Sequence, residues 1–288
     1  PAPSMDEVFV CGPEAMIEAT EAALLEAGVP AHRIHTERFT SGPAMAAKVQ
    51  ADWPEVRVVA CLDAVLADPA IALVVIASPN HSHFALAQAA LLAGKHVVID
   101  KPLTPTLAEA RALVALAAER NLVLSAFHNR RWDSDFLTLR ALLASGQLGA
   151  VHRIQSRFDR YRPDVRQRWR EQPGPASGLW WDLGPHLLDQ ALQLFGPPQR
   201  LWADIRRVRA GAQSDDEFLA ILDYGSLRLE LGASMLALQP APRWQVAGAL
   251  GYYCKQGLDP QEAALKQGER PAYAGWGEDS DSGQLHHQ

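Results

Sequence analysis

Short apolar runs alternate with longer amphipathic runs as far as about residue 126, and this alternation restricts the possible fold more than any other feature. The apolar runs predict strands at residues 7–11, 33–39, 56–60, 72–77, 96–100 and 123–127, and the amphipathic runs predict helices at 13–27, 44–51, 62–67, 82–92 and 106–119. Strands separated by helices pair in parallel through right-handed crossovers. The sequence therefore predicts a Rossmann-like, doubly wound α/β sheet over residues 1–127.

The pattern changes after residue 127. Helices are predicted at 136–144 and 185–194, and longer strand-like runs at 201–208, 218–224, 227–234 and 244–253. Short turns such as Asp223-Tyr224-Gly225-Ser226 join consecutive strands, which is typical of antiparallel pairing. We expect an α+β domain with a mainly antiparallel sheet over residues 128–288. The Gly-, Pro-, Asp- and Ser-rich segment after Lys266 is interpreted as loop or frayed end.

The charge balance argues against a nucleic-acid partner. The net charge is -6 and the pI is about 5.9, whereas binding to phosphate backbones needs a concentrated basic face. The main basic stretch, residues 153–170, is interleaved with Asp159, Asp164 and aromatic residues. This pattern favours a mixed-charge surface or a sugar-facing loop.

Cysteine and histidine spacing indicates neither a disulfide scaffold nor a metal centre. The three cysteines are widely separated, at Cys11, Cys61 and Cys254. No carboxylate or cysteine completes a plausible local ligand set around His81, His83 and His186, so we expect no metal. No apolar run approaches the roughly 20 residues of a membrane span, and the N-terminus lacks a signal-peptide pattern. These features predict a soluble cytoplasmic protein without a membrane partner.

Two segments contain the clearest candidates for catalytic side chains. Lys101 follows the predicted strand 96–100 within Asp100-Lys101-Pro102, and Asp182 and His186 lie four residues apart within Asp182-Leu183-Gly184-Pro185-His186. At a helix start this spacing places a carboxylate and an imidazole on one side. An ammonium, an imidazole and a carboxylate acting on one hydroxyl are what proton and hydride removal from a secondary alcohol requires.

Several motifs in order resemble the Gfo/Idh/MocA family of NAD(P)-dependent oxidoreductases from about residue 44 onward. They are Ser78-Pro79-Asn80-His81-Ser82-His83, Gly94-Lys95-His96-Val97-Val98-Ile99-Asp100-Lys101-Pro102, His128-Asn129-Arg130-Arg131-Trp132 and Asp182-Leu183-Gly184-Pro185-His186. The strings Asp159-Arg160-Tyr161-Arg162-Pro163 and Arg168-Trp169-Arg170-Glu171 are most similar to the inositol-dehydrogenase-like branch. The resemblance implies hydride transfer between a cyclic polyol or sugar and NAD or NADP.

The resemblance also implies residue roles. Lys101, Asp182 and His186 are the expected catalytic residues, with His186 as general base and Lys101 stabilising the alkoxide. The expected cofactor contacts are Gly12, Pro13, Glu37, Ser78, Asn80, His83, Lys101 and Pro102. The expected substrate contacts are Asn129, Arg130, Tyr161, Trp169 and Trp180, although core packing explains the tryptophans equally well. A homo-oligomer, dimer or tetramer, through the C-terminal sheet is expected.

The N-terminal segment departs from the family pattern. The family has a glycine-rich turn after its first strand, and here Glu14 occupies the position of the second glycine in Cys11-Gly12-Pro13-Glu14. Residues 6–41 instead resemble the closing segment of ferredoxin-reductase-type NAD(P)-binding domains, such as the reductase component of phenylacetyl-CoA epoxidase. We interpret the chain as a chimera in which residues 1–43 replace one βαβ unit. The choice between NAD and NADP stays open, because Glu37 favours NAD and the adjacent Arg38 favours NADP.

Family members usually continue beyond the position of residue 285, so the C-terminal domain is expected to be incomplete. Two alternatives to a dehydrogenase stay open at this point. Glu14 favours a non-catalytic ligand-binding or scaffold protein with impaired cofactor binding. An NAD-dependent glycosidase or dehydratase is the second alternative, and it differs by retaining its cofactor through the reaction cycle.

Overall fold

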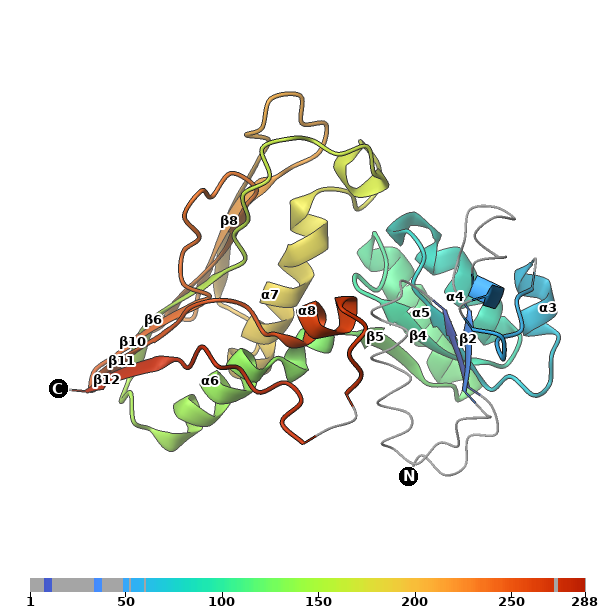
Figure 1. Cartoon of the computed structure of the whole chain (residues 1–288), viewed down its shortest axis with the longest axis horizontal. Coiled ribbons are helices and arrows are strands. Elements are labelled where there is room, and N and C mark those ends of the chain that lie inside the picture. Colours follow the sequence, from blue (N-terminus) through green and yellow to red (C-terminus); the bar gives the residue numbers. More distant parts are fainter. Residues whose placement is uncertain are drawn as a thin grey trace. The chain divides into compact units, whose positions relative to one another are not determined.

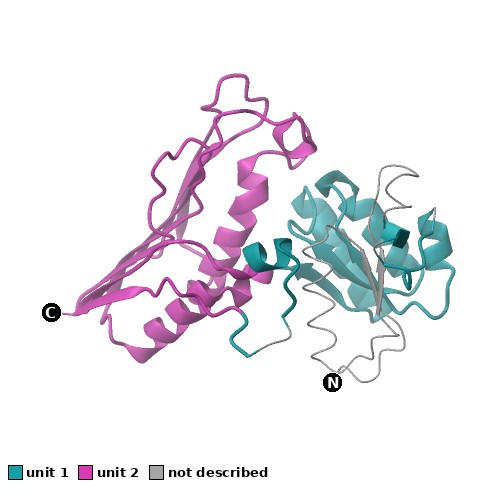
Figure 2. Cartoon of the chain, in the orientation of Figure 1, with its two compact units in different colours: residues 1–127, 262–276 teal, residues 128–261, 277–288 magenta. Residues whose placement is uncertain are grey.

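The computed structural model describes residues 8–11, 34–37, 49–51, 53–59, 61–271 and 274–287, with the backbone alone for 8–11 and 34–37. The chain forms two compact units (Figure 2). Unit 1 contains residues 1–127 and 262–276, and unit 2 contains residues 128–261 and 277–288. The predicted helix 13–27 and the glycine-turn residues Gly12 and Pro13 lie outside the described residues.

Unit 1 contains a parallel sheet with the order β2-β1-β3-β4-β5 (Figure 1). Its strands are β1 (Val8–Cys11), β2 (Ile34–Glu37), β3 (Leu73–Ile76), β4 (His96–Asp100) and β5 (Leu124–Phe127). All four pairings are parallel, which confirms the predicted doubly wound fold. All four residues of β3 are buried, as expected for a central strand covered on both faces.

Three helices that cover the sheet of unit 1 are α3 (Leu62–Leu66), α4 (His83–Leu92) and α5 (Leu107–Arg120). A capping box sets the start of α5: Glu109 N donates to Thr106 Oγ1 at 3.2 Å, and Thr106 N donates to Glu109 Oε2 at 3.1 Å. Buried Ala87, Ala90 and Leu91 of α4 pack with apolar strand residues in one core. These helices and strands match the predicted positions within a few residues.

The predicted strand 56–60 is wrong for its described part. Val56 N donates to Trp53 O at 3.1 Å, which makes a turn, and residues 56–59 enter no sheet among the described pairings. Arg57 extends from this segment to Asp68, 3.2 Å away. Val56, which is buried, and the half-buried Val59 account for the apolar pattern without strand pairing.

Unit 2 contains a seven-stranded, mainly antiparallel sheet with the order β12-β11-β10-β6-β9-β8-β7. Its strands are β6 (Val151–Arg157), β7 (Arg200–Arg206), β8 (Glu217–Asp223), β9 (Arg228–Ser234), β10 (Trp244–Gly248), β11 (Gly251–Lys255) and β12 (Gln284–His287). The single parallel pairing joins β6 to β9. The predicted α+β class is thereby confirmed.

Helices α6 (Ser134–Ser145) and α7 (Leu179–Phe195) pack on one face of this sheet (Figure 1). The short helix α8 (Gln261–Lys266) belongs almost entirely to unit 1 (Figure 2). Along β8 alternate residues are buried, and Phe218, Ala220 and Leu222 join the core with Leu183 and Leu187 of α7. The sheet therefore supports α7 along its length.

Three predictions for unit 2 need correction. The run 244–253 is two strands, β10 and β11, which pair as an antiparallel hairpin. Ala249 and Leu250 form the turn between them, and their N–H groups donate to Ala150 O and Leu148 O. The segment after Lys266 is not only loop, because β12 pairs with β11. No strand is predicted at residues 151–157, most of which belong to the basic stretch 153–170, yet they form β6 near the middle of the sheet.

Candidate active site

The carboxyl ends of β3 and β4 bring two predicted motifs to one edge of the unit 1 sheet. Ile76 and Ile99 are partners in the parallel register, so the residues that follow each strand lie at the same edge. Lys101 is buried there, and its backbone N–H donates to Asp100 Oδ1 at 2.9 Å. This edge is where ligands bind in doubly wound folds.

His83 joins these two motifs. Its ring is fully buried, with Nδ1 2.9 Å from Pro102 O and Nε2 2.9 Å from Ser78 O. Both neighbours are backbone carbonyl oxygens, and the tautomer of the ring decides which nitrogen donates. The His83 ring thus ties the loop after β3 to the turn after β4.

Polar contacts within the loop also hold Ser78 and Ser82, which lie on either side of Asn80. The Ser78 and Ser82 hydroxyl oxygens are 2.5 Å apart, and Ser82 Oγ donates to Pro79 O at 2.8 Å. Asn80 begins the short 3-10 helix η3 (Asn80–Ser82) and is buried. The cofactor role predicted for this loop stays a prediction.

The sheet order identifies the edge at which a dinucleotide fits. The order reverses at β1, which pairs with β2 on one side and β3 on the other. A crevice outside the carboxyl ends of the strands at such a reversal is the usual dinucleotide site. Backbone pairing places Glu37 opposite Cys11, at the carboxyl ends of β2 and β1, and the predicted cofactor contact of Glu37 stays a prediction.

In unit 2, Asp182 and His186 lie one turn apart on α7. Asp182 Oδ1 is 3.4 Å from Arg170 Nε, and the Asp182 side chain is about one-fifth exposed. His186 is buried. A spacing of four residues places both on one face of the helix, as the sequence predicts.

The start of α7 differs from the prediction because a distant residue caps it. The helix begins at Leu179, six residues before the predicted start at Pro185. Asp215, in the β7–β8 connection, accepts from Trp180 N at Oδ2 (2.6 Å) and from Leu179 N at its carbonyl oxygen (2.8 Å). Proline is common at the first helical position, but here tertiary capping allows the helix to start earlier.

Gly184 has a packing role within the predicted motif. A Cβ built at Gly184 would lie 2.9 Å from Cε3 of Trp180. The Trp180 ring also packs edge-on against Phe218, with centroids 5.0 Å apart. The geometry therefore favours core packing for Trp180, one of the predicted substrate contacts.

The other predicted substrate contacts have different surroundings. Asn129 and Arg130 begin the 3-10 helix η4 (Asn129–Trp132); Asn129 is half-buried, whereas Arg130 is buried, 3.2 Å from Asp133. Tyr161 is 52% exposed. Trp169 is half-buried, and the Arg170 guanidinium lies 4.5 Å from its ring centroid. Their substrate roles stay predictions.

A buried polar network beside α7 is not predicted by any sequence motif. Arg243 is enclosed in the core, where its guanidinium lies 3.0 Å from Asp135 and donates to Gln190 Oε1 at 2.6 Å. Gln190 also donates to Arg130 O at 2.8 Å. Burial raises the pKa of the neighbouring Asp133 to about 7, opposed by the charge of Arg130. No local pattern marks Arg243, because its partners are distant in sequence.

Family comparisons cover both units. A family model described as an oxidoreductase family with an NAD-binding Rossmann fold matches residues 35–128, and one described as the GFO/IDH/MocA C-terminal domain matches residues 136–254. The chain is 57% identical over 238 residues to the uncharacterized oxidoreductase YdgJ of Escherichia coli, covering 83% of this chain and 69% of YdgJ. It is 41% identical over 232 residues to the scyllo-inositol 2-dehydrogenase (NADP(+)) IolW of Bacillus subtilis, covering 81% and 65%.

Solved structures agree with this assignment. YPO2259 from Yersinia pestis superposes with a TM-score of 0.88 at 46% identity, covering 100% of this chain and 80% of that chain. An oxidoreductase from Bacillus cereus gives 0.83 at 31% identity, covering 98% and 80%. Against YdgJ and IolW, the chain spans about two-thirds of the length of each relative. These matches do not support the resemblance of residues 6–41 to ferredoxin reductases.

The described part of the chain contains neither a helix able to cross a membrane nor a group of three potential metal-ligating side chains.

Proposed function

Because the chain belongs to the Gfo/Idh/MocA family of oxidoreductases with an NAD-binding Rossmann fold, we propose that it transfers a hydride between a secondary alcohol of a cyclic polyol or sugar and NAD or NADP. The observation that carries this proposal is the placement of Asp182 and His186 on one face of α7, with Arg170 beside Asp182. The similarity to IolW, a scyllo-inositol 2-dehydrogenase, supports a polyol substrate.

Each proposed catalytic residue has one role. The His186 imidazole takes the proton of the substrate hydroxyl, because an imidazole accepts protons near neutral pH. The Lys101 ammonium stabilises the developing alkoxide. The Asp182 carboxylate orients the substrate or the imidazole. When bound, the nicotinamide supplies the acceptor for the hydride.

Residues of unit 1 would hold the dinucleotide. The loop after β3, with Ser78 and Asn80, and the Lys101-Pro102 turn lie at the carboxyl edge of the sheet. The contacts of His83 to Pro102 O and Ser78 O keep the loop and the turn together. Held together in this way, the loop and the turn would limit the movement of a bound cofactor.

A polyol and sugar screen with NAD and NADP, followed by the absorbance of the reduced nicotinamide, tests the proposal. Reduced cofactor should accumulate in solution with at least one polyol or sugar. The Lys101→Ala variant should lose about 10²-fold or more in turnover. Lys266→Ala is the matched control, because Lys266 is 62% exposed on α8. A near-normal rate for Lys101→Ala would contradict the proposed role.

A titration with NADH and NADPH, followed by nicotinamide fluorescence, separates cofactor binding from chemistry. Saturable binding of one dinucleotide identifies the cofactor. If product forms without release of reduced cofactor, the reaction belongs to the glycosidase or dehydratase class instead.

A further inference from the structure

The loop between β6 and α7 carries an arginine that pairs with Asp182. Residues 162–168 form neither a strand nor an α-helix, and the loop ends in the 3-10 helix η5 (Trp169–Glu171). Within η5, the Arg170 guanidinium lies 4.5 Å from the Trp169 ring centroid, and Arg170 Nε lies 3.4 Å from Asp182 Oδ1. A segment without regular backbone pairing needs other contacts to hold such a distance.

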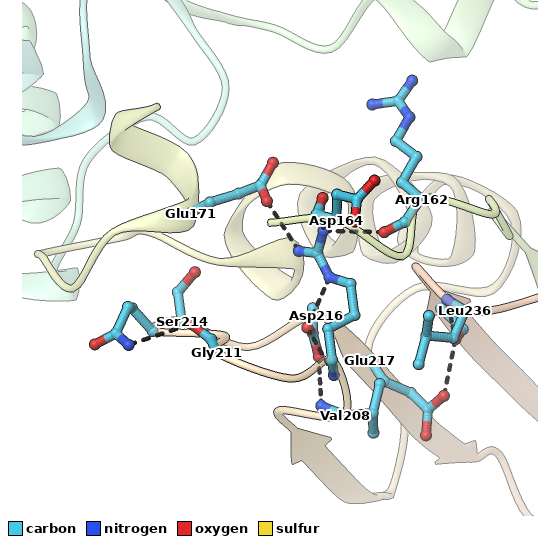
Figure 3. Close-up of polar contacts among 12 residues, drawn as sticks. Arg162, Asp164, Glu171, Val208, Gly211, Ser214, Asp216, Glu217 and Leu236 are labelled. Atoms are coloured by element: carbon cyan, nitrogen blue, oxygen red, sulfur yellow. Dashed lines mark hydrogen bonds and ion pairs between the residues drawn. The ribbon is translucent and has the colours of Figure 1, made fainter. Parts of the chain in front are cut away.

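One buried arginine in the β7–β8 connection supplies these contacts. Arg209 Nη1 donates to Arg162 O at 3.1 Å and to Asp164 O at 3.0 Å. Its Nη2 donates to Glu171 Oε2 at 3.0 Å, and its Nε donates to Asp216 Oδ2 at 2.9 Å. Figure 3 shows Asp164, Glu171 and Asp216 around this one guanidinium. Because a guanidinium is planar and rigid, it holds both ends of the loop in one fixed arrangement.

Asp216 anchors this guanidinium to the sheet. Its backbone N–H donates to Arg206 O of β7 at 2.9 Å, and its carbonyl oxygen accepts from Met235 N, just beyond β9, at 3.0 Å. Its carboxylate also accepts from Val208 N at 2.7 Å, and its side chain is 1% exposed. The sheet, rather than the loop, therefore determines the position of Arg209.

Glu171 links Arg209 to η5. Its Oε2 also accepts from Arg166 N at 3.0 Å, and its Oε1 accepts from Arg168 Nε at 2.6 Å. Burial raises the pKa of Glu171, but these hydrogen bonds and the charges of Arg168 and Arg209 lower it overall. The Glu171 carboxylate is thus ionised and held in place next to Arg170.

The residue before Asp216 fixes the other side of the same contact. Asp215 caps the start of α7 with its carboxylate and its carbonyl oxygen, and α7 carries Asp182. Two successive residues thus hold the helix and the loop to one point of the chain. This common anchor determines how closely Arg170 approaches Asp182.

We propose that Arg209 is a positioning residue for the site at Asp182 and His186. It fixes η5 through Glu171. The Arg170 guanidinium then holds the Asp182 carboxylate in one orientation toward the substrate. This inference rests on the proposed function, in which Asp182 orients the substrate or the imidazole. A carboxylate held in one orientation reaches the reactive geometry more often than one that rotates freely.

A double-mutant cycle on kcat/KM tests this relay with a polyol or sugar that the screen identifies. Arg209→Met and Arg170→Gln should each lower kcat/KM by about tenfold or more. The double variant should be about as active as the less active single variant, because both changes disturb the same contact to Asp182. Losses that multiply in the double variant overturn the proposal, since Arg209 then acts independently of Arg170.

Two further variants keep the test decisive. Glu171→Gln replaces Arg209→Met if the latter does not fold, because glutamine keeps the size and an oxygen acceptor but loses the charge. It should show the same non-additivity with Arg170→Gln. Arg209→Lys should retain more activity than Arg209→Met, because it keeps the charge, but less than wild type, because an ammonium lacks the rigid fork of donors.

Hydrogen exchange of the full chain tests the hold on the loop without a substrate. Arg209→Met should raise the exchange rates of the amides in residues 162–171 by about tenfold or more over wild type. Unchanged rates in this segment overturn the proposal. If the rates rise but no polyol or sugar is turned over, the hold of Arg209 on the loop is supported and only the proposed function is contradicted.

Lys255→Met is the matched control for a buried cation. The Lys255 side chain is 4% exposed and lies 2.9 Å from Asp279, and its strand β11 is separated from β8 by β10, β6 and β9. Lys255→Met should leave the exchange of residues 162–171 near that of wild type and should not couple to Arg170→Gln in kcat/KM. Equal increases in exchange in Lys255→Met and Arg209→Met overturn the proposal.

Discussion

Asp189 on α7 accepts two hydrogen bonds from the Arg131 guanidinium, from Nε at 2.7 Å and from Nη2 at 2.5 Å. His128 Nε2 lies 3.9 Å from the same carboxylate. This bidentate pair joins η4 to α7, three residues beyond His186. It therefore fixes the helix that carries the proposed general base against the segment that begins unit 2.

A double-mutant cycle measures this pair. Arg131→Gln and Asp189→Asn should show a coupling of about 1–3 kcal/mol in the free energy of unfolding, since Asp189 is 10% exposed but Arg131 is 40% exposed. The more exposed pair Arg200 and Asp223 is the control and should couple by less than about 1 kcal/mol. Equal coupling in the two pairs would refute a structural role for Asp189.

Removing the cap of α7 should destabilise unit 2. Asp215→Ala deletes the acceptor of Trp180 N and should cost about 0.5–2 kcal/mol in urea unfolding. Asp215→Asn keeps an oxygen acceptor and should cost less.

Gly178→Ala should destabilise unit 2 more than Asp215→Ala does, because the added Cβ would lie 1.9 Å from Asp215 Oδ1 and Gly178 has a φ of +95°. Wild-type stability of Gly178→Ala would contradict the close approach.

The pKa of Asp133 predicts a pH dependence of stability. Burial raises this pKa to about 7, above the unfolded value of about 3.9, so folding takes up a proton between these pH values. The free energy of unfolding should therefore fall as the pH rises from about 4 to about 7, and then level off.

The variant Asp133→Asn isolates this effect. Between about pH 5 and pH 8, the free energy of unfolding of the wild type should fall by about 1–4 kcal/mol relative to that of Asp133→Asn. Urea unfolding across the pH series measures this difference. Asp223→Asn, in an exposed ion pair, is the control. Parallel stability curves for wild type and Asp133→Asn would show that Asp133 ionises normally.

The predicted homo-oligomer through the C-terminal sheet can be tested on β7. Leu201, Trp202 and Ile205 of this edge strand are 54%, 53% and 44% exposed. We expect the full chain to sediment as a dimer or tetramer, and Trp202→Glu to shift it to a smaller species. Arg140→Glu, on the exposed side of α6, is the control. A wild-type monomer, or no shift in Trp202→Glu, would count against this interface.

Local signals explain which elements could be predicted. The strand His96–Asp100 matches its prediction because five residues alternate in burial between a turn at Gly94 and the motif at Lys101. Helix α5 is predicted within one residue at each end, since Thr106 and Glu109 form its capping box. By contrast, β6 alternates polar and apolar residues too weakly to be separated from the basic stretch around it.

The sequence by itself determined the parallel pairing of the unit 1 strands, the family and the places of Lys101, Asp182 and His186 in their motifs. Apolar periodicity, caps and motifs act within a few residues of each other, so they can be read along the chain. Tertiary structure alone decided the cap from Asp215, the pairing of Asp189 with Arg131 and the loop held by Arg209. Burial removes water as a partner, so each of these polar groups bonds to whichever distant group the fold brings near.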